Sequence, residues 1–284
     1  MERESLLVVL FIVLGGVTLH LFAAWPRANA PAPASRPAER AQWLALWWPA
    51  APTSLVAAWL CGWALSEPDP VPDRVGSMLF IACIPFALVL ARAVLRAGWS
   101  LARSPGNCGV ATVGILRPYI VFAPQLAKCL DDRAIEAALA HERAHLRHRD
   151  PLRIWVAQFV TDLQWPWGLA QRRFACWLEM LELARDDEAR AAGVDGADLA
   201  AALVGTLRFQ ARLRCTGGVG LIGQPQAVKT RVARLLRPLP APSRHRQASP
   251  AAIAISLTVA LALAVLLGVV VGERIIGPLL ALSA

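Results

Sequence analysis

The sequence lacks closely spaced pairs of cysteines. Its six cysteines, at positions 61, 83, 108, 129, 176 and 215, include no CxxC pair. A disulfide framework and a cysteine-ligated zinc site are therefore not expected, and we expect buried free thiols instead. The glycine-rich string TGGVG at 216–220 lacks the lysine and the spacing of a phosphate-binding loop, so it is interpreted as a flexible connector.

Charged residues are missing from three long apolar stretches. The chain has 284 residues, of which 56% are hydrophobic, and its mean hydropathy of +0.47 is too high for an ordinary soluble domain. Four stretches, 5–25, 41–65, 75–95 and 251–272, approach the roughly 20 residues that cross a hydrocarbon core. Only the third contains a charged residue, Arg92, while Pro49 and Pro52 interrupt the second. The sequence thus predicts a mainly helical membrane protein with four spans.

A cleaved signal peptide is the alternative for the first stretch, since the small residues at 28–30 could form a cleavage site. However, Glu2, Arg3 and Glu4 do not make a basic leading region, and the apolar run exceeds the roughly 7–15 residues of a signal peptide. A transmembrane span is therefore favoured.

Positive charge is concentrated between the third and fourth spans. Residues 96–247 hold 22 Lys or Arg and 13 Asp or Glu, so the whole net charge of +9 lies there. By the positive-inside rule this segment is expected in the cytoplasm, with both termini and a short tail at 273–284 outside. Its basic edges are expected to face the anionic inner leaflet, and no nucleic-acid motif accompanies them. These edge residues are Arg92, Arg96, Arg103, Lys229, Arg231, Arg234, Arg237, Arg244 and Arg246.

One motif within this basic segment carries chemistry. His141 and His145 are four residues apart on a predicted helix at 132–149, which Asp131 caps, so both imidazoles lie on one face and can bind one Zn²⁺. Zinc lowers the pKa of a water molecule from about 15.7 towards 7, and Glu142 between the histidines can take its proton. The motif predicts a zinc peptidase, with the solvated charged helix face as the alternative.

A catalytic zinc site needs a third protein ligand. Further helices are expected at 152–164, 169–192, 197–213 and 225–237, and one strand region at 111–123. In the helix 169–192, Glu182 and Asp186 share one face, so Glu182 is the predicted third ligand and Asp186 a partner for the distal nitrogen of a ligand histidine. Asp187 and Glu188 are interpreted as solvated, and His148 as too far along the helix to join the site.

These residues resemble a known family. The run 111–152, which includes AHERAHLRHRDPL, is similar to the zinc-protease domain of the BlaR/MecR-type membrane metallopeptidases, and WPWGLAQRRF, ELARDDEARAAG and GLIGQPQAVKTRVARLL resemble its later elements. The resemblance implies a mostly helical, zincin-like domain with His141, His145 and Glu182 as zinc ligands and Glu142 as general base. Arg185 stands where the family often has cysteine. The penicillin-binding sensor of the β-lactam-sensing members is not expected after the fourth span.

The function implied is a regulatory zinc endopeptidase of a bacterial-type inner membrane. The implied targets are a cytoplasmic winged-helix repressor and the protein itself; contact with the bilayer is expected, and direct nucleic-acid binding is not. Two alternatives stay open. One is a non-proteolytic signalling or scaffold protein, and the other is a membrane quality-control protease of the HtpX type, in which two spans rather than one follow the motif.

Overall fold

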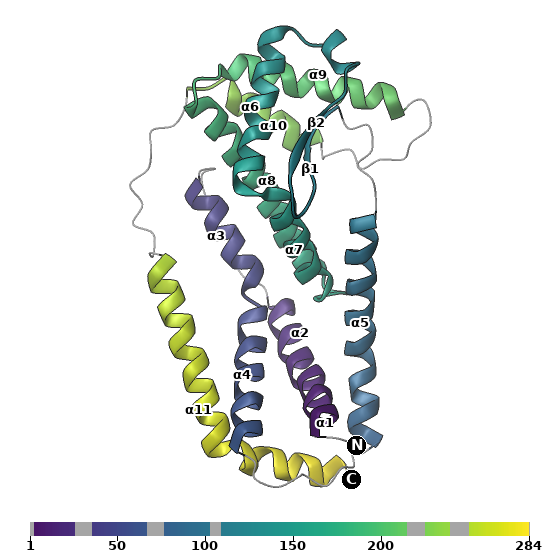
Figure 1. The fold of residues 1–284 in the computed structure, drawn as a ribbon, viewed down its shortest axis with the longest axis vertical. Coiled ribbons are helices and arrows are strands. Elements are labelled where there is room, and N and C mark those ends of the chain that lie inside the picture. The colour runs from purple at the N-terminus through teal and green to yellow at the C-terminus, as the bar shows by residue number, and fades with distance from the viewer. Residues whose placement is uncertain are drawn as a thin grey trace.

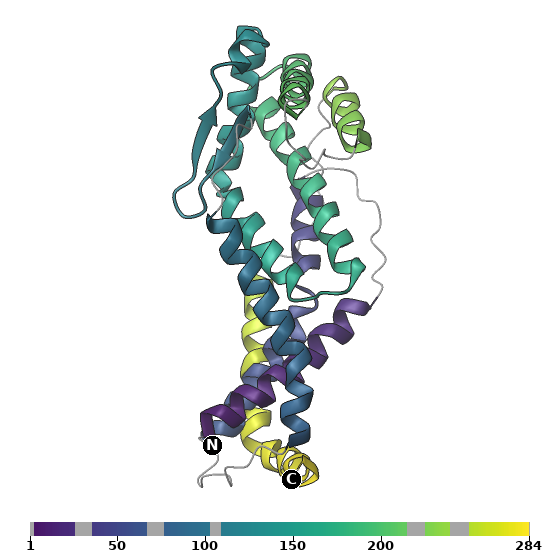
Figure 2. The same ribbon diagram turned by 90° about the vertical axis from the view of Figure 1, so that its right-hand side faces the viewer.

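The computed structural model describes residues 3–25, 36–66, 77–102, 109–214, 225–238 and 250–283. The possible cleavage site at 28–30 and the glycine-rich string at 216–220 lie outside these ranges. The described part is almost entirely helical with one small sheet, which confirms the expected mainly α architecture with a β element. Long apolar helices occupy one end of the molecule and a helical domain the other (Figures 1 and 2).

Three helices are long and apolar enough to cross a membrane. The first runs through α1 (Arg3–Leu10), the π-helical turn η1 (Phe11–Gly15) and α2 (Gly16–Ala24); the second is α5 (Ser77–Ala102) and the third the central part of α11 (Pro250–Ser283). Large apolar side chains on α5 and α11, including Ile81, Leu88, Leu95, Leu263 and Val270, are exposed, as expected of lipid-facing surfaces. The helix α11 extends through the residues predicted as a tail and turns across the end of the bundle (Figure 1).

The second predicted stretch is broken into two helices. The helix α3 (Arg36–Trp47) and the helix α4 (Ala50–Ser66) meet at a bend of 45°. Pro49 lies at the break, where its missing N–H cannot continue the helical hydrogen bonds. The stretch counts as a fourth span only if the bent pair is taken together.

Close packing of α4 against α11 depends on glycines. A Cβ atom on Gly62 would lie 2.0 Å from the carbonyl oxygen of Val265, and one on Gly268 would lie 2.0 Å from that of Trp59. Small residues of this kind allow membrane helices to approach without a gap. Trp63, which is 1% exposed, fills the space beside them.

The domain at the other end begins with a hairpin. Strands β1 (Val110–Val113) and β2 (Tyr119–Phe122) pair antiparallel, and the short helix η2 (Leu126–Lys128) leads into α6 (Asp132–His148). The remaining helices are α7 (Asp150–Asp162), α8 (Gly168–Ala191), α9 (Gly196–Arg214) and α10 (Pro225–Leu235). Strand β1 and the helices α8 and α9 pack around α6, which carries the histidine motif.

The helix α3 packs against this domain. Leu46 joins Ala157 of α7 and Phe174, Trp177 and Leu181 of α8 in one buried cluster. Further contacts tie the domain to the apolar helices, because Arg92 and Arg96 of α5 pair with the buried Asp162. These two arginines therefore make an internal contact that the sequence did not predict.

The cysteines are only partly as expected. Cys61, Cys83, Cys129 and Cys176 are free, in agreement with the prediction. Cys83 is buried, but Cys61 and Cys129 are exposed, so the expectation of burial is wrong for these two.

Candidate metal centre

The helix α6 brings the two motif histidines together. Its first turn is capped by the Asp131 side chain, which accepts a hydrogen bond of 2.8 Å from the N–H of Ala134. Small alanines at 134, 137, 138 and 144 let neighbouring elements pack closely on its inner face. His141 and His145 lie on that face, each 8% exposed, and their Nε2 atoms are 3.0 Å apart.

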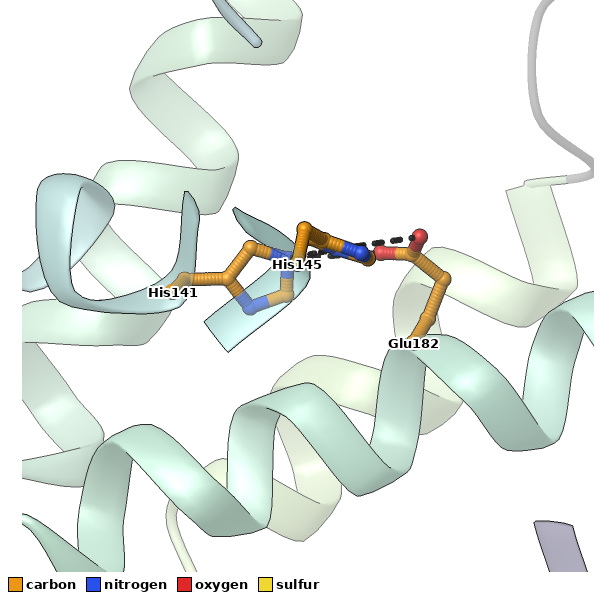
Figure 3. Close-up of side chains that lie close together, drawn as sticks. All are labelled: His141, His145 and Glu182. Carbon is orange, nitrogen blue, oxygen red and sulfur yellow. Dashed lines mark hydrogen bonds and ion pairs between the residues drawn. The ribbon is translucent and has the colours of Figure 1, made fainter. Parts of the chain in front are cut away.

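The helix α8 supplies a carboxylate at the same point. Leu181 and Leu183 are buried on either side of Glu182, whose side chain is 35% exposed. Oε2 of Glu182 lies 3.5 Å from Nε2 of His141, and Oε1 lies 3.6 Å from Nε2 of His145 (Figure 3). The three residues predicted as ligands are therefore brought together.

These distances fit a zinc ion. Tetrahedral ligands at 2.0–2.1 Å from the metal are about 3.3 Å from one another. The two Nε2 atoms are 3.0 Å apart, and each lies 3.5–3.6 Å from a different oxygen of Glu182. With one ligand atom per residue, the three atoms lie within 4.8 Å of one another, close enough to surround one ion. Among the described residues, this is the one group of three His, Cys, Asp or Glu side chains that could hold a metal. Two nitrogens and one oxygen are a usual donor set for zinc with an open fourth position.

A second carboxylate stands behind each histidine. Nδ1 of His141 lies 2.9 Å from Oδ1 of Asp186, where the sequence predicts such a partner. Nδ1 of His145 lies 2.9 Å from Oδ2 of Asp150, which is fully buried. The contact at His145 is a hydrogen bond, and a carboxylate bonded in this way holds Nδ1 protonated, so that Nε2 is free to bind a metal. The contact at His141 is an ion pair.

The sequence does not predict the role of Asp150, which follows the last residue of the helix expected at 132–149. Between α6 and α7, Arg149 adopts a left-handed backbone conformation with φ of 51°. This turn directs Asp150, the first residue of α7, back towards His145. The spacing of five residues between them was the available signal.

Arg231 is the largest departure from the sequence prediction. It was expected to face the inner leaflet, but from α10 its Nε and Nη2 reach Oδ2 and Oδ1 of Asp186 at 2.9 and 2.8 Å. Its Nη1 lies 2.7 Å from Oε2 of Glu182. One guanidinium therefore neutralises the third-ligand carboxylate and the carboxylate behind His141. Arg234 also points inward, to Asp187 at 2.7 Å.

Glu142 lies between the predicted metal ligands and the hairpin, and its side chain is half-buried. The hydroxyl of Thr112 in β1 is 2.7 Å from Oε2 of Glu142 and 2.9 Å from its backbone oxygen, and can donate its single proton to either. Strand β1 thereby fixes the position of the predicted general base. Thr112 is a contact that the sequence did not predict.

Electrostatics keep the site's carboxylates ionised. Burial alone would raise the pKa of Asp150, but Arg185 and His145 hold it well below its usual range. Burial would also raise the pKa of Glu182, which Arg231 and the two histidines lower instead. For His141, burial lowers the pKa, but Asp186 and Glu182 outweigh this effect and raise it to about 9.

Two neighbouring residues are not part of the centre. Nε2 of His148 lies 2.8 Å from Oε2 of Glu188, whose other oxygen accepts hydrogen bonds from Arg147. His148 is therefore directed away from the centre, as its position along α6 predicts. The prediction of a solvated Glu188 is wrong, since this residue is 9% exposed and forms ion pairs.

Comparison with known proteins gives one match. Residues 109–178 match the family described as BlaR1 peptidase M56. The segment begins at the hairpin, includes His141, Glu142, His145 and Asp150, and ends four residues before Glu182. No curated protein and no solved structure gave a match. Over these residues the chain is similar to the BlaR/MecR-type peptidase family, whose members are membrane zinc metallopeptidases.

Proposed function

We propose that this chain is a membrane-bound zinc endopeptidase. The observation that carries the proposal is the group formed by His141, His145 and Glu182, with the carboxylate of Glu142 on the same helix. A structural zinc site would have four protein ligands, whereas in the part of the chain that the structure describes three lie within ligand distance of one another.

The chain's own residues divide the work of hydrolysis. His141, His145 and Glu182 would hold the metal, which when bound polarises a scissile carbonyl and lowers the pKa of a water molecule. Glu142 takes the proton of the attacking water and delivers it to the leaving amine, as a general base and then a general acid. Thr112 holds one oxygen of Glu142 and leaves the other for this transfer.

The active domain is proposed to lie in the cytoplasm of a bacterial-type cell. The whole net charge of +9 is carried by residues 96–247, which the positive-inside rule assigns to the cytoplasmic side. The beginning of α1 and the end of α11 lie at the opposite end of the molecule (Figure 1), and so would be external.

The proposed substrate is a cytoplasmic regulatory protein. The first candidates are the winged-helix repressors that the family resemblance implies, and the second is the chain itself. Glu142 is half-buried and the side chain of Glu182 is 35% exposed, so neither carboxylate is sealed from the surface of the domain.

The proposal is tested on the detergent-purified full chain. Zinc content and cleavage of casein, a purified repressor and the chain itself are measured for the wild type and for Glu142→Ala. We expect about one zinc per chain in both proteins and a rate at least about 100-fold lower in the variant, as for loss of a general base. Equal cleavage rates in the two proteins would rule out the proposal.

A further inference from the structure

The helix α3 carries a buried carboxylate although it borders the apolar helices. Glu39 in its first turn is 6% exposed. A buried carboxylate requires a cationic partner and hydrogen bonds, since its desolvation is otherwise too costly. Both come from the domain: Nη2 of Arg153 lies 2.5 Å from Oε1 of Glu39, and Nε1 of Trp177 donates to the same oxygen at 3.2 Å.

Arg153 is held in one geometry by aromatic rings from two helices. Its guanidinium lies 4.8 Å from the ring centre of Trp43 in α3 and 5.6 Å from that of Trp177 in α8. Such cation–π contacts fix the plane of the guanidinium. Its Nη1 then donates to Oδ1 of Asp150 at 3.0 Å, so one planar fork joins Glu39 to Asp150.

Asp150 is the carboxylate behind a predicted zinc ligand. It has no solvent exposure, and its other contacts are to Arg185, which donates from Nη2 at 2.9 Å, and to Nδ1 of His145 at 2.9 Å. The position of the Asp150 carboxylate sets the orientation of the His145 ring. Three consecutive side-chain contacts therefore connect Glu39 to His145.

We propose that Glu39 and Arg153 are positioning residues of the metal centre, which makes the membrane-proximal helix α3 part of the support of His145. The proposal rests on the metal-binding role proposed above and adds a route for its regulation. Because α3 meets α4 at the 45° bend, a movement of α3 relative to α7 separates Glu39 from Arg153 and releases one restraint on Asp150. The centre then retains its metal less tightly.

A purely structural role of Glu39 and Arg153 would have different consequences. If the pair between Glu39 and Arg153 only holds α3 on the domain, its loss lowers the thermal stability and leaves metal binding by the folded protein unchanged. Metal affinity and ligand geometry therefore separate the two roles, whereas stability does not.

The test compares Glu39→Gln with Glu179→Gln, which removes an exposed glutamate of α8. Zinc affinity of the folded, detergent-purified full chain is measured by competition with a chromophoric chelator, and ligand geometry by the d–d absorption of the Co²⁺-substituted protein. We expect Glu39→Gln to weaken zinc binding about three- to tenfold, less than the 10–100-fold typical of a direct partner such as Asp150. The Co²⁺ bands should shift in Glu39→Gln and stay unchanged in Glu179→Gln.

Arg153→Lys is the conservative variant. Lysine keeps the charge but cannot bridge two carboxylates as the guanidinium does, so its zinc affinity should fall between those of the wild type and Asp150→Asn. Wild-type zinc affinity and an unchanged Co²⁺ spectrum in Glu39→Gln would overturn the proposal, whatever the change in thermal stability. A wild-type chain that binds zinc but cleaves no protein contradicts the peptidase function alone, because both readouts here are independent of cleavage.

Discussion

At the scale of single residues, each histidine of the centre has its own carboxylate, and each carboxylate its own arginine. Asp186 behind His141 is paired with Arg231, and Asp150 behind His145 with Arg185. The two arginines come from α10 and α8, and Arg153 of α7 is a second partner of Asp150.

The first residue-scale prediction concerns protons at His141. In the metal-free protein its pKa of about 9 means that the ring is protonated at pH 7, while a zinc ligand must be neutral. Zinc binding at pH 7 should therefore release about one proton, and affinity should rise with pH up to about 9, by about tenfold per unit. Calorimetric titration in buffers of different ionisation enthalpy measures the number of protons released.

Asp186→Asn serves as the comparison for this prediction. Without the Asp186 charge, the pKa of His141 should be lower and fewer protons should leave on zinc binding at pH 7. No proton release from the wild type at this pH would contradict the assignment.

The second residue-scale prediction concerns Arg231. The variant Arg231→Ala leaves Glu182 and the 1% exposed Asp186 without their arginine, so the metal-free protein should lose about 1–3 kcal/mol of stability. This loss is smaller than for a fully buried pair, because Arg231 itself is 17% exposed. A zinc ion restores positive charge beside Glu182. The increase in melting temperature on adding zinc should therefore be larger in Arg231→Ala than in the wild type.

Arg237→Ala is the control, since this arginine of the same C-terminal region is exposed. Its melting temperature with EDTA and with zinc should match the wild type. If Arg231→Ala gained no more stability from zinc than the wild type, the guanidinium would not be the counter-charge of the site.

The sequence predicts those parts of the site that depend on local spacing. His141, Glu142 and His145 follow from the periodicity of one helix, and Asp186 follows from Glu182 by the same rule. Arg231 and Thr112 could not be found in this way, because their partners lie 45 and 30 residues away and the contacts depend on tertiary packing. A basic residue near a span has the same sequence signature whether it faces lipid headgroups or a buried carboxylate.

At the scale of helices, the sequence predicts only part of the bent pair formed by α3 and α4. Hydropathy and length predict an apolar stretch at 41–65, and Pro49 marks its weak point. The side to which α3 turns depends on Leu46, Trp43 and Glu39 finding partners on α7 and α8. Those partners come from residues more than 100 positions later, so the position of α3 is not a local property of the sequence.

The element-scale prediction concerns the contact between α4 and α11. In Gly268→Ala the new methyl would meet the backbone oxygen of Trp59, so the helices must separate, at a cost typical of overpacking, about 1–3 kcal/mol. Gly98→Ala in α5 meets nothing within 4 Å, and should be neutral or stabilising because alanine favours helix. Thermal unfolding followed by tryptophan fluorescence compares the two. Equal melting temperatures would contradict the close approach of α4 and α11.

At the scale of the whole molecule, the apolar helices and the metal centre lie at opposite ends but are not independent. Arg92 and Arg96 of α5 reach Asp162 at the end of α7, and Glu39 of α3 reaches Arg153 near the beginning of α7. Both ends of α7 are thus tied to helices that border or enter the membrane, while its first residue supports His145. A movement of α3 or α5 can therefore reach α7, the helix that carries Asp150, through either of these two contacts.

The whole-molecule prediction concerns the side of the membrane on which the domain lies. Cys129, at the exposed end of η2, should be cytoplasmic if the +9 segment follows the positive-inside rule, whereas Ser77 at the start of α5 should be external. We compare a variant that keeps Cys129 alone with one that carries Cys129→Ser and Ser77→Cys, the other cysteines being replaced by serine. A membrane-impermeant maleimide should label the Ser77→Cys variant in intact spheroplasts and Cys129 only after permeabilisation. Labelling of Cys129 in intact spheroplasts would reverse the orientation, and the proposed cytoplasmic substrates could then not reach Glu142.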